Sequence, residues 1–410
     1  MYVASGNNLP RIKALNQSTI REIIYHYGPI SRGEIAERLS LALPTITGAI
    51  NNLLSIGFIR EVGTDDSSEK KAMGRKVARI DIVEDFRIFL GVEIRGTCRC
   101  ACVTDYRGKI LFSAKDDVPC LVYEQAMAET AEMIRRLLKR GQMPLEKISG
   151  ICVCLPGLVA AEGGILKLHP GYGWENKDVR GDIARLLDYQ GPVLVENNAC
   201  ARTYAMRLFH QAELNEAKTF AYLFVSLGIA CHFVHNEIGP RVSYASSGEA
   251  GHMVMDPDGP LCSCGNRGCL EALSSEKAII ARCKELVKRG RETALRYLCV
   301  DPSSPTIAEI LQAQEEGDVY VSQILETAIY YLGVAIANIY NFISPQRMVI
   351  ECSLFQSERN KERLLEVIHK NLYTATITDV NFTFMPPDEL SGAVGAAAVA
   401  IQRDLTTYIE

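Results

Sequence analysis

The sequence lacks any extreme of composition or charge. Its 410 residues contain 44 Lys and Arg against 49 Asp and Glu, so the net charge is only −5 and the chain as a whole is not a basic nucleic-acid coat. Hydrophobic residues make up 48% and charged residues 23%, which excludes a disordered chain, a collagen-like repeat and a small disulfide-stapled protein. At ~100–200 residues per domain, the length predicts two to four domains.

The sequence also lacks a recognisable secretory signal. The first residues, MYVASGNNLPRIK, have no apolar core behind a basic start. One uncharged stretch, Thr327–Gln346, reaches the length of a membrane span, but it contains Asn338, Asn341 and Pro345, so we interpret it as a buried helix. We therefore expect a cytoplasmic protein with no membrane partner. Most of its 14 cysteines are then thiols, or metal ligands where they cluster.

Residues 1–82 differ in charge from the rest of the chain. They contain 11 Lys and Arg against 8 Asp and Glu, a net charge of +3, whereas the remainder has 33 against 41, a net charge of −8. A slightly basic head on an acidic body permits DNA contact at one end of the molecule only.

Three short helices are predicted in this head. Apolar residues at helical spacing mark the first over residues 12–26, and Gly28-Pro29 ends it. Ser31 and Glu34 have the spacing of a capping box and begin the second helix. Pro44 suits the first turn of the third. Three helices with a tight turn between the second and the third are typical of a helix-turn-helix.

A β-hairpin wing is expected after the third helix. Phe58–Val62 and Val77–Ile82 have strand patterns and flank a polar loop at residues 63–74. The helices and the hairpin together predict a winged helix-turn-helix, mostly α with a β-hairpin wing, whose third helix enters the major groove of DNA.

The exposed face of the third helix carries hydroxyl and amide groups, which contact base edges and phosphates. We expect DNA contacts from Thr45, Thr47 and Asn51, and from Arg75 and Lys76 at the end of the wing loop. A small helical bundle that mediates protein contacts is the alternative. We favour DNA, because this face lacks the apolar residues that a protein-docking helix needs.

Residues 248–271, GEAGHMVMDPDGPLCSCGNRGCLE, contain the strongest chemical signal. Cys262, Cys264 and Cys269 form a C-x-C-x4-C cluster, with His252 ten residues before the first of them. Three thiolates and one imidazole fill the tetrahedral shell of Zn²⁺ and leave no position for a water, so the pattern predicts one structural zinc in the loop 252–269. Free thiols in a loop are the alternative, and a disulfide is disfavoured in the cytoplasm.

Other cysteines have a different pattern. Two sets alternate at period two and are expected on one face of a strand, packed as small apolar side chains: Cys98, Cys100 and Cys102, and then Cys152 and Cys154. A second metal site at Cys231, His232 and His235 is disfavoured, because these residues follow a strand pattern with no fourth ligand nearby.

From residue 87 the chain alternates strands and helices, which implies α/β layers. Strands are predicted at Ile88–Ile94, Cys98–Thr104, Lys109–Ala114, Ile148–Leu155, Val193–Val195, Phe220–Leu227, Met348–Ile350 and Phe382–Met385. Helices are predicted at Tyr123–Arg140, through most of residues 276–345, and at Gly392–Ile401.

Several of these pieces together resemble the ROK family of repressors, open reading frames and sugar kinases. They are the zinc segment, the Pro156-Gly157 turn, the strand end at Glu196-Asn197 and the N-terminal helix-turn-helix. The resemblance covers nearly the whole chain. It implies a winged helix at residues 1–82 and, at residues 83–410, an actin-like (ribonuclease H-like) body of two α/β subdomains around a sugar-binding cleft. Members with such a winged helix are mostly sugar-responsive repressors.

The resemblance also shows what a kinase of this family would need. Family kinases carry an Asn-Asp pair whose carboxylate accepts the sugar proton, and here the pair is Asn197-Asn198. The two phosphate loops also depart from the family patterns, since Glu93–Thr97 reads EIRGT and Ser226–Phe233 reads SLGIACHF. A third glycine-rich turn, near the nucleotide base in the family, is replaced by Ile350–Ser353. The chain is therefore not expected to be an enzyme.

The sugar-binding half of the family pattern is better preserved. The resemblance assigns sugar hydroxyls to Glu249, His252 and Glu271, and to Asn197 at the strand end. Glu249 has an alternative role as a helix cap or an arginine partner, and Glu271 as a group that orients the zinc loop. Asn198 is only a weak candidate for a ligand contact, because the family has Asp there.

These observations predict a sugar-responsive transcriptional repressor that binds operator DNA as a homodimer or homotetramer, with a sugar or sugar phosphate as effector. One alternative is a ROK-type sugar kinase with an appended DNA-binding domain. Another is a DNA-binding protein whose body is a protein-docking platform without a small ligand. The single tryptophan, Trp174, either stacks on the sugar or packs at a subdomain edge, and we favour packing.

Overall fold

The N-terminal helices form where the local sequence signals place them. The computed structural model describes residues 9–64, 78–119, 121–169, 171–236, 248–373 and 381–408. It contains α1 (Leu9–Tyr27), α2 (Arg32–Leu39) and α3 (Leu43–Ser55). Ser31 and Glu34 form the predicted capping box: the Glu34 amide donates to the Ser31 hydroxyl and the Ser31 amide donates to the Glu34 carboxylate. Ile46 and Ile50 of α3 are fully buried.

A three-stranded sheet completes the winged helix. Its strands are β1 (Ile30–Ser31), β2 (Ile59–Thr64) and β3 (Ala78–Ile82), in the order β1-β3-β2. β2 continues two residues beyond the predicted strand end, because an irregularity in register after Glu61 lets Thr64 pair with Ala78. Residues 65–77, and with them Arg75 and Lys76, lie outside the described residues.

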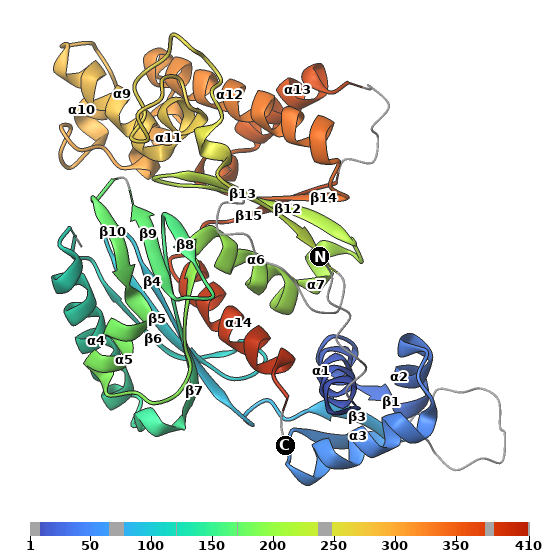
Figure 1. The fold of residues 1–410 in the computed structure, drawn as a ribbon. Helices are drawn as coiled ribbons and strands as arrows, with labels where there is room; N and C mark the ends of the chain where they lie inside the picture. The colour runs from blue at the N-terminus through green and yellow to red at the C-terminus, as the bar shows by residue number, and fades with distance from the viewer. Residues whose placement is uncertain are drawn as a thin grey trace, which may run out of the picture.

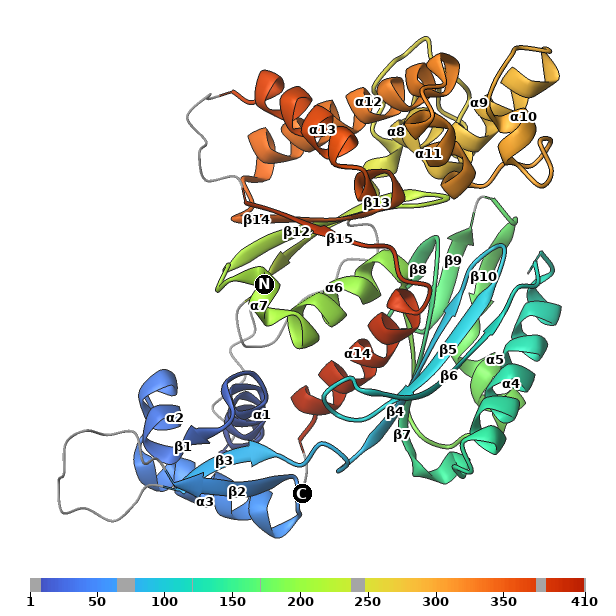
Figure 2. The ribbon, with the colours of Figure 1, turned by 180° about the vertical axis from the view of Figure 1, so that it is seen from behind.

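Two further sheets form the cores of two α/β subdomains (Figures 1 and 2). The first subdomain has the strand order β11-β7-β4-β5-β6. These strands are β4 (Ile88–Ile94), β5 (Arg99–Thr104), β6 (Ile110–Asp116), β7 (Ile148–Leu155) and β11 (Val193–Asn197). A small sheet adjoins them, formed by β8 (Leu158–Ala160), β9 (Ile165–His169) and β10 (Trp174–Asp178).

Helices cover both faces of the five-stranded sheet. One face packs against α4 (Tyr123–Arg140) and α5 (Val179–Leu187), and the other against α14 (Ser391–Thr406), which also packs on α6 (Asn198–Phe209). The predicted cysteine stripe is confirmed, since Cys98, Cys100 and Cys102 are buried against Ala393 and Ala397 of α14. Cys152 and Cys154 are buried in the core on the α14 face.

The second subdomain has the strand order β13-β12-β14-β15. Its strands are β12 (Thr219–Val225), β13 (Ile229–His235), β14 (Arg347–Cys352) and β15 (Asn381–Met385). Its helices are α8 (Leu270–Ser274), α9 (Glu276–Lys288), α10 (Leu295–Leu298), α11 (Ile307–Glu315), α12 (Val319–Ile343) and α13 (Glu358–Asn371). Short connections are η1 (Leu145–Lys147), α7 (Gln211–Leu214), η2 (Ala250–His252) and η3 (Ser353–Gln356).

Helix α12 is the one described helix that is long and apolar enough to cross a membrane by length and composition. Leu325, Leu332 and Ile336 are fully buried in the core that α12 shares with the four-stranded sheet and its neighbouring helices. It packs against α13, α8 and α9. Burial of these residues supports the interpretation of the uncharged stretch as a core helix.

Trp174 is also a core residue. Its side chain is 4% exposed and lies against Tyr123, with ring centroids 5.4 Å apart. Its indole N–H donates to the carbonyl of Leu121 at 3.0 Å, so the polar end is satisfied. The packing interpretation is confirmed.

The winged helix rests on the first subdomain through buried charges of α1. Arg21 is fully buried, and its guanidinium donates to the carboxylate of Asp404 in α14 at 2.9 Å and to the carbonyl of Thr407 at 2.7 Å. Glu22 is 1% exposed and accepts hydrogen bonds from Arg207 of α6 and Gln402 of α14. Helix α1 is therefore attached to the body by directional contacts.

A substitution at Gly91 can test how closely β4 packs against α14. A Cβ at Gly91 would overlap the backbone oxygen of Ala393 and the backbone nitrogen of Ala397. We expect Gly91→Ala to lower the free energy of unfolding by about 1–3 kcal/mol or more, because backbone atoms cannot yield without moving the helix. Gly48→Ala in α3 is the control: a Cβ there meets no atom within 4 Å, and a gain of about 0.5–1 kcal/mol is expected. Denaturant unfolding of both variants measures this, and equal effects would contradict it.

Candidate metal centre and effector site

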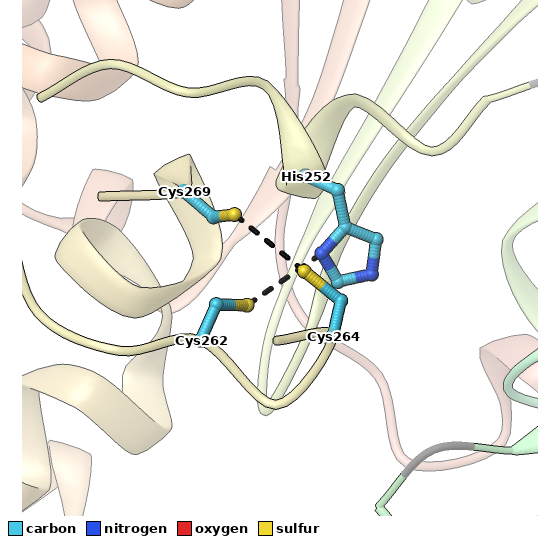
Figure 3. A group of neighbouring side chains, drawn as sticks. All are labelled: His252, Cys262, Cys264 and Cys269. Carbon is cyan, nitrogen blue, oxygen red and sulfur yellow. Dashed lines mark hydrogen bonds between the residues drawn. The ribbon is translucent and has the colours of Figure 1, made fainter. Parts of the chain in front are cut away.

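Three cysteines and one histidine meet in the loop before α8. His252 belongs to η2, Cys269 immediately precedes α8, and Cys262 and Cys264 lie on the connecting turn. Figure 3 shows the four side chains pointing toward one another. Their ligand atoms all lie within 4.8 Å of one another, and no other such group occurs in the part of the chain that the structure describes. The predicted set is therefore assembled as one candidate metal centre.

The spacing of these atoms fits a tetrahedral ion. The Sγ of Cys262 lies 3.6 Å from Nδ1 of His252, and the Sγ of Cys264 lies 3.7 Å from the Sγ of Cys269. A tetrahedron with Zn–S bonds of ~2.3 Å and Zn–N bonds of ~2.0 Å has S···N edges of ~3.5 Å and S···S edges of ~3.8 Å. The donor set supplies four ligands, which completes a closed shell.

The loop folds tightly because two glycines permit it. Gly265 and Gly268 have φ of +95° and +65°, and a Cβ at Gly268 would overlap the carbonyl of Asp256. Bridges between Val254 and Cys269 and between residues 261 and 267 close the loop on itself. The backbone therefore brings Cys269 back to His252.

Two of the predicted sugar ligands lie beside this centre. Glu249 is exposed, yet neighbouring protein atoms displace water from its carboxylate and raise its pKa. The charge of Glu271 raises this pKa further, and His252 lowers it. Glu249 makes no cap hydrogen bond to η2, so its capping alternative is not realised. The structure thus brings Glu249, His252 and Glu271 together.

Glu271 makes contacts that support its alternative role. Its carboxylate accepts from the backbone amide of Ile229 at 3.2 Å and from the hydroxyl of Ser263 at 3.4 Å. Ile229 begins β13, in the segment that corresponds to the second phosphate loop of a family kinase. Glu271 therefore connects the metal loop to the β12–β13 turn. The backbone amide of Ile229 donates to Glu271 and is not free to bind a phosphate.

Asn197 lies at the carboxyl end of β11, in the first subdomain. Its side-chain oxygen accepts from the amides of Ala199 and Cys200 at 2.9 and 3.2 Å, and its amide nitrogen donates to the carbonyl of Gly157 at 3.0 Å. Asn197 is thus the N-cap of α6 and holds the Pro156-Gly157 turn. One N–H of its side chain remains for a ligand.

A buried charge network surrounds Glu93, the first residue of the EIRGT segment. Arg202 of α6 is 1% exposed and donates to Glu93 of β4 at 2.8 Å. Its Nε lies 3.2 Å from the carboxylate of Glu351 in β14. Burial alone would raise the pKa of Glu93, but the charges of Arg202 and Arg95 hold it at about 2. Two subdomains are thus joined by one guanidinium.

Further groups complete this network. The hydroxyls of Tyr222 and Ser391 donate to Glu351 at 2.6 and 2.9 Å, and the amide of Asn198 donates to Glu93 at 3.3 Å. Sequence reasoning missed Arg202 and the partner role of Glu351. A charged residue four positions after Asn198 in an otherwise apolar stretch, and a glutamate within the apolar strand MVIEC, were the available signals.

The third helix of the winged helix presents the predicted polar face. Thr45 and Asn51 are exposed, and Thr47 is half-buried with its hydroxyl donating to the carbonyl of Leu43 at 2.9 Å. The hydroxyl of Thr47 keeps its acceptor lone pairs for a DNA group. The structure therefore leaves all three side chains on the outer face of α3.

Comparisons with known proteins identify the family. The ROK family model matches residues 89–403, and a MarR family model matches residues 15–62. The chain belongs to the ROK family, with a MarR-type winged helix at its N-terminus and an actin-like α/β body.

Similar curated proteins are named as regulators. The chain is 27% identical over 346 residues to the xylose repressor of Bacillus subtilis (strain 168), covering 84% of each chain. It is 28% identical over 363 residues to the DNA-binding transcriptional dual regulator NagC of Escherichia coli (strain K12), covering 87% of this chain and 84% of the relative.

Two solved structures share the fold. A ROK family transcriptional regulator, described as a homologue of the E. coli MLC protein, has a TM-score of 0.79 at 24% identity and covers 96% of this chain and 97% of its own. A ROK family glucokinase from Streptomyces griseus, in complex with glucose and AMPPNP, has a TM-score of 0.65 at 20% identity and covers 77% of this chain and 99% of its own. The body fold is thus common to regulators and kinases.

The metal centre yields a direct prediction. Cys264→Ser removes one of four ligands, and we expect the purified protein to lose most of its bound metal, measured by elemental analysis. Cys299→Ser is the control, because Cys299 is buried outside the cluster. Wild-type metal content in Cys264→Ser would show that the thiol is not a ligand.

Proposed function

We propose that this protein is a sugar-responsive transcriptional repressor without kinase activity. Residues 1–82 bind operator DNA, and residues 83–410 bind a sugar or sugar phosphate and assemble a homodimer or homotetramer in the cytoplasm. The observation that carries the proposal is a winged helix with an exposed polar α3, joined to a ROK family body in which Arg202 pairs with Glu93 of the EIRGT segment and with Glu351. The names of the xylose repressor and NagC relatives support it.

In the proposed DNA complex, α3 lies in the major groove with Thr45, Thr47 and Asn51 toward the bases, and Arg75 and Lys76 of the wing contact phosphates or the minor groove. Two heads are needed for a palindromic operator, so the active form is at least a dimer. A single head binding a few base pairs would have little specificity on its own.

In the proposed effector complex, Glu249 and Glu271 accept hydrogen bonds from sugar hydroxyls, and the free N–H of Asn197 donates one. A metal at the centre is proposed to be a structural Zn²⁺, which holds His252 through Nδ1 and leaves Nε2 for the ligand. Closure of the loop around the ion fixes the positions of His252 and Glu271 together, so the shape of the sugar site depends on metal binding.

The absence of a general base supports a regulator rather than a kinase. An amide at Asn198 does not accept a proton at neutral pH, and it is already bound to Glu93. In the comparison with family kinases, Glu93 stands in the segment of the first phosphate loop and Glu351 in the turn near the nucleotide base, and Arg202 pairs with both carboxylates. Phosphate binding there would require this network to open.

Regulation follows from differential binding. For an effector to release DNA, it must bind the released state more tightly than the DNA-bound state. A ratio of ~100 in affinity corresponds to about 2.7 kcal/mol of coupling.

The effector prediction uses thermal unfolding and DNA release together. The probes are xylose, glucose, N-acetylglucosamine and the 6-phosphates of the last two, with a DNA duplex that the wild-type protein selects from a random library. We expect one of them to raise Tm and release the duplex, because a ligand that binds only the folded state adds about 2.7 kcal/mol at 100 times its Kd.

Matched variants locate this effect. Glu249→Gln should lose the Tm shift, whereas Glu358→Gln, an exposed glutamate of α13, should retain it. A flat panel with intact DNA binding would favour the protein-docking alternative. Failure to select any DNA would refute the repressor proposal.

The kinase alternative has its own test. Neither the wild-type protein nor Asn198→Asp is expected to consume ATP in the presence of the same sugars. A carboxylate at residue 198 would face Glu93, and Arg202 would still be paired with Glu93 rather than free for a phosphate. A coupled ADP assay measures turnover, with Asn215→Asp as the control on an exposed turn. Sugar-dependent ADP release by the wild-type protein would restore the kinase alternative.

A further inference from the structure

Helix α6 contacts all three parts of the molecule. Its N-cap, Asn197, is a proposed effector ligand; Arg202 at its middle pairs with carboxylates of both subdomains; and Arg207 near its end reaches the winged helix. Figures 1 and 2 show α6 between the four-stranded sheet and α14, with α1 close to its C-terminal half. Helix α6 has twelve residues. At ~1.5 Å per residue it is one continuous helix ~18 Å long.

The contact at the C-terminal end is buried and directional. Arg207 donates to the side-chain oxygen of Gln402 at 2.6 Å and to the carboxylate of Glu22 at 3.2 Å, and Gln402 donates to the same carboxylate at 2.7 Å. Arg207 and Glu22 are each 1% exposed and Gln402 is 7% exposed. A displacement of α6 would separate these charges in a dry environment, so it is opposed unless α1 moves with it.

The contact at the middle ties α6 to the relative position of the two sheets. Glu93 belongs to the first subdomain and Glu351 to the second, and Arg202 holds both. Any change in the angle between the subdomains must therefore displace Arg202 or break one of its ion pairs. The helix carries such a displacement to its other end, because helices move as rigid elements.

We propose that α6 transmits changes in the sugar-binding body to the DNA-binding domain. Arg207 is the positioning residue that keeps α1 in a fixed position relative to α6. This inference rests on the proposed function, because it concerns how an effector-binding body controls DNA binding. The transmitting contact is the Arg207–Glu22–Gln402 network, which includes a residue of α6, rather than the neighbouring Arg21–Asp404 pair, which connects α1 to α14.

The experiment is a double-mutant cycle on DNA affinity that needs no effector. Asn197→Ala removes the N-cap at one end of α6, and Glu22→Leu with Arg207→Met removes both charges at the other end together, since a lone buried charge could prevent folding. The two sites are about 15 Å apart along the helix axis, at ~1.5 Å per residue. Effects at independent sites this far apart are additive within a factor of about 2.

In the wild-type background we expect Asn197→Ala to lower the affinity for the selected duplex about 5-fold or more. A 5-fold change is at the lower end of the range that is typical of allosteric coupling. In the Glu22→Leu/Arg207→Met background the same change should alter affinity less than about 2-fold. The control background is Gln314→Leu/Asn360→Leu, which removes a buried polar pair between α11 and α13 far from α6. In this control the full effect of Asn197→Ala should persist.

Each outcome decides the inference. An additive cycle, or an Asn197→Ala variant with unchanged DNA affinity, would overturn it. Loss of the Asn197→Ala effect in the Gln314/Asn360 background as well would show general destabilisation rather than transmission, and would also overturn it. If the wild-type protein selects no DNA, the proposed function fails instead. Should the Glu22/Arg207 double variant fail to fold, Gln402→Leu replaces it, because Gln402 bridges the same two charges.

Discussion

The need to pair the buried guanidinium of Arg202 constrains the whole body of this protein. An ionised group removed from water costs several kcal/mol unless opposite charges and hydrogen bonds compensate it. Here the compensation comes from Glu93 in one sheet and Glu351 in the other, with Tyr222 and Ser391 completing the shell of Glu351. The two subdomains can separate only if this compensation is lost. The ion pairs of Arg202 therefore hold the two subdomains in their relative position.

The same network involves two of the segments in which this chain departs from the pattern of the family kinases. A ROK family glucokinase from Streptomyces griseus, which shares the body fold, has been solved in complex with glucose and AMPPNP. In this chain Arg202 of α6 bridges the two subdomains by pairing with Glu93 and Glu351. The metal loop, by contrast, keeps a donor set that matches a tetrahedral ion and places Glu249 and Glu271 beside His252.

Short-range patterns predicted most of the fold. The capping box of Ser31 and Glu34, the period-two cysteines and the C-x-C-x4-C cluster are local, and each is confirmed as a local arrangement. The charge networks could not be found in this way, since Glu22 and Arg207 are 185 residues apart in the sequence and neither has a pattern that indicates the other. Asn197 illustrates the same limit, because its capping bonds depend on where α6 begins.

Helix α14 connects segments of the molecule that lie far apart in the sequence. It covers one face of the five-stranded sheet, packs along α6 and supplies Asp404 and Gln402 to the first helix of the chain. A chain without these residues has strands β4 and β7 uncovered, Arg21 without the carboxylate of Asp404, and the Glu22–Arg207 pair without Gln402. The head therefore takes its final orientation only once α14 has docked, and the position of the head on the body depends on the body being fully folded.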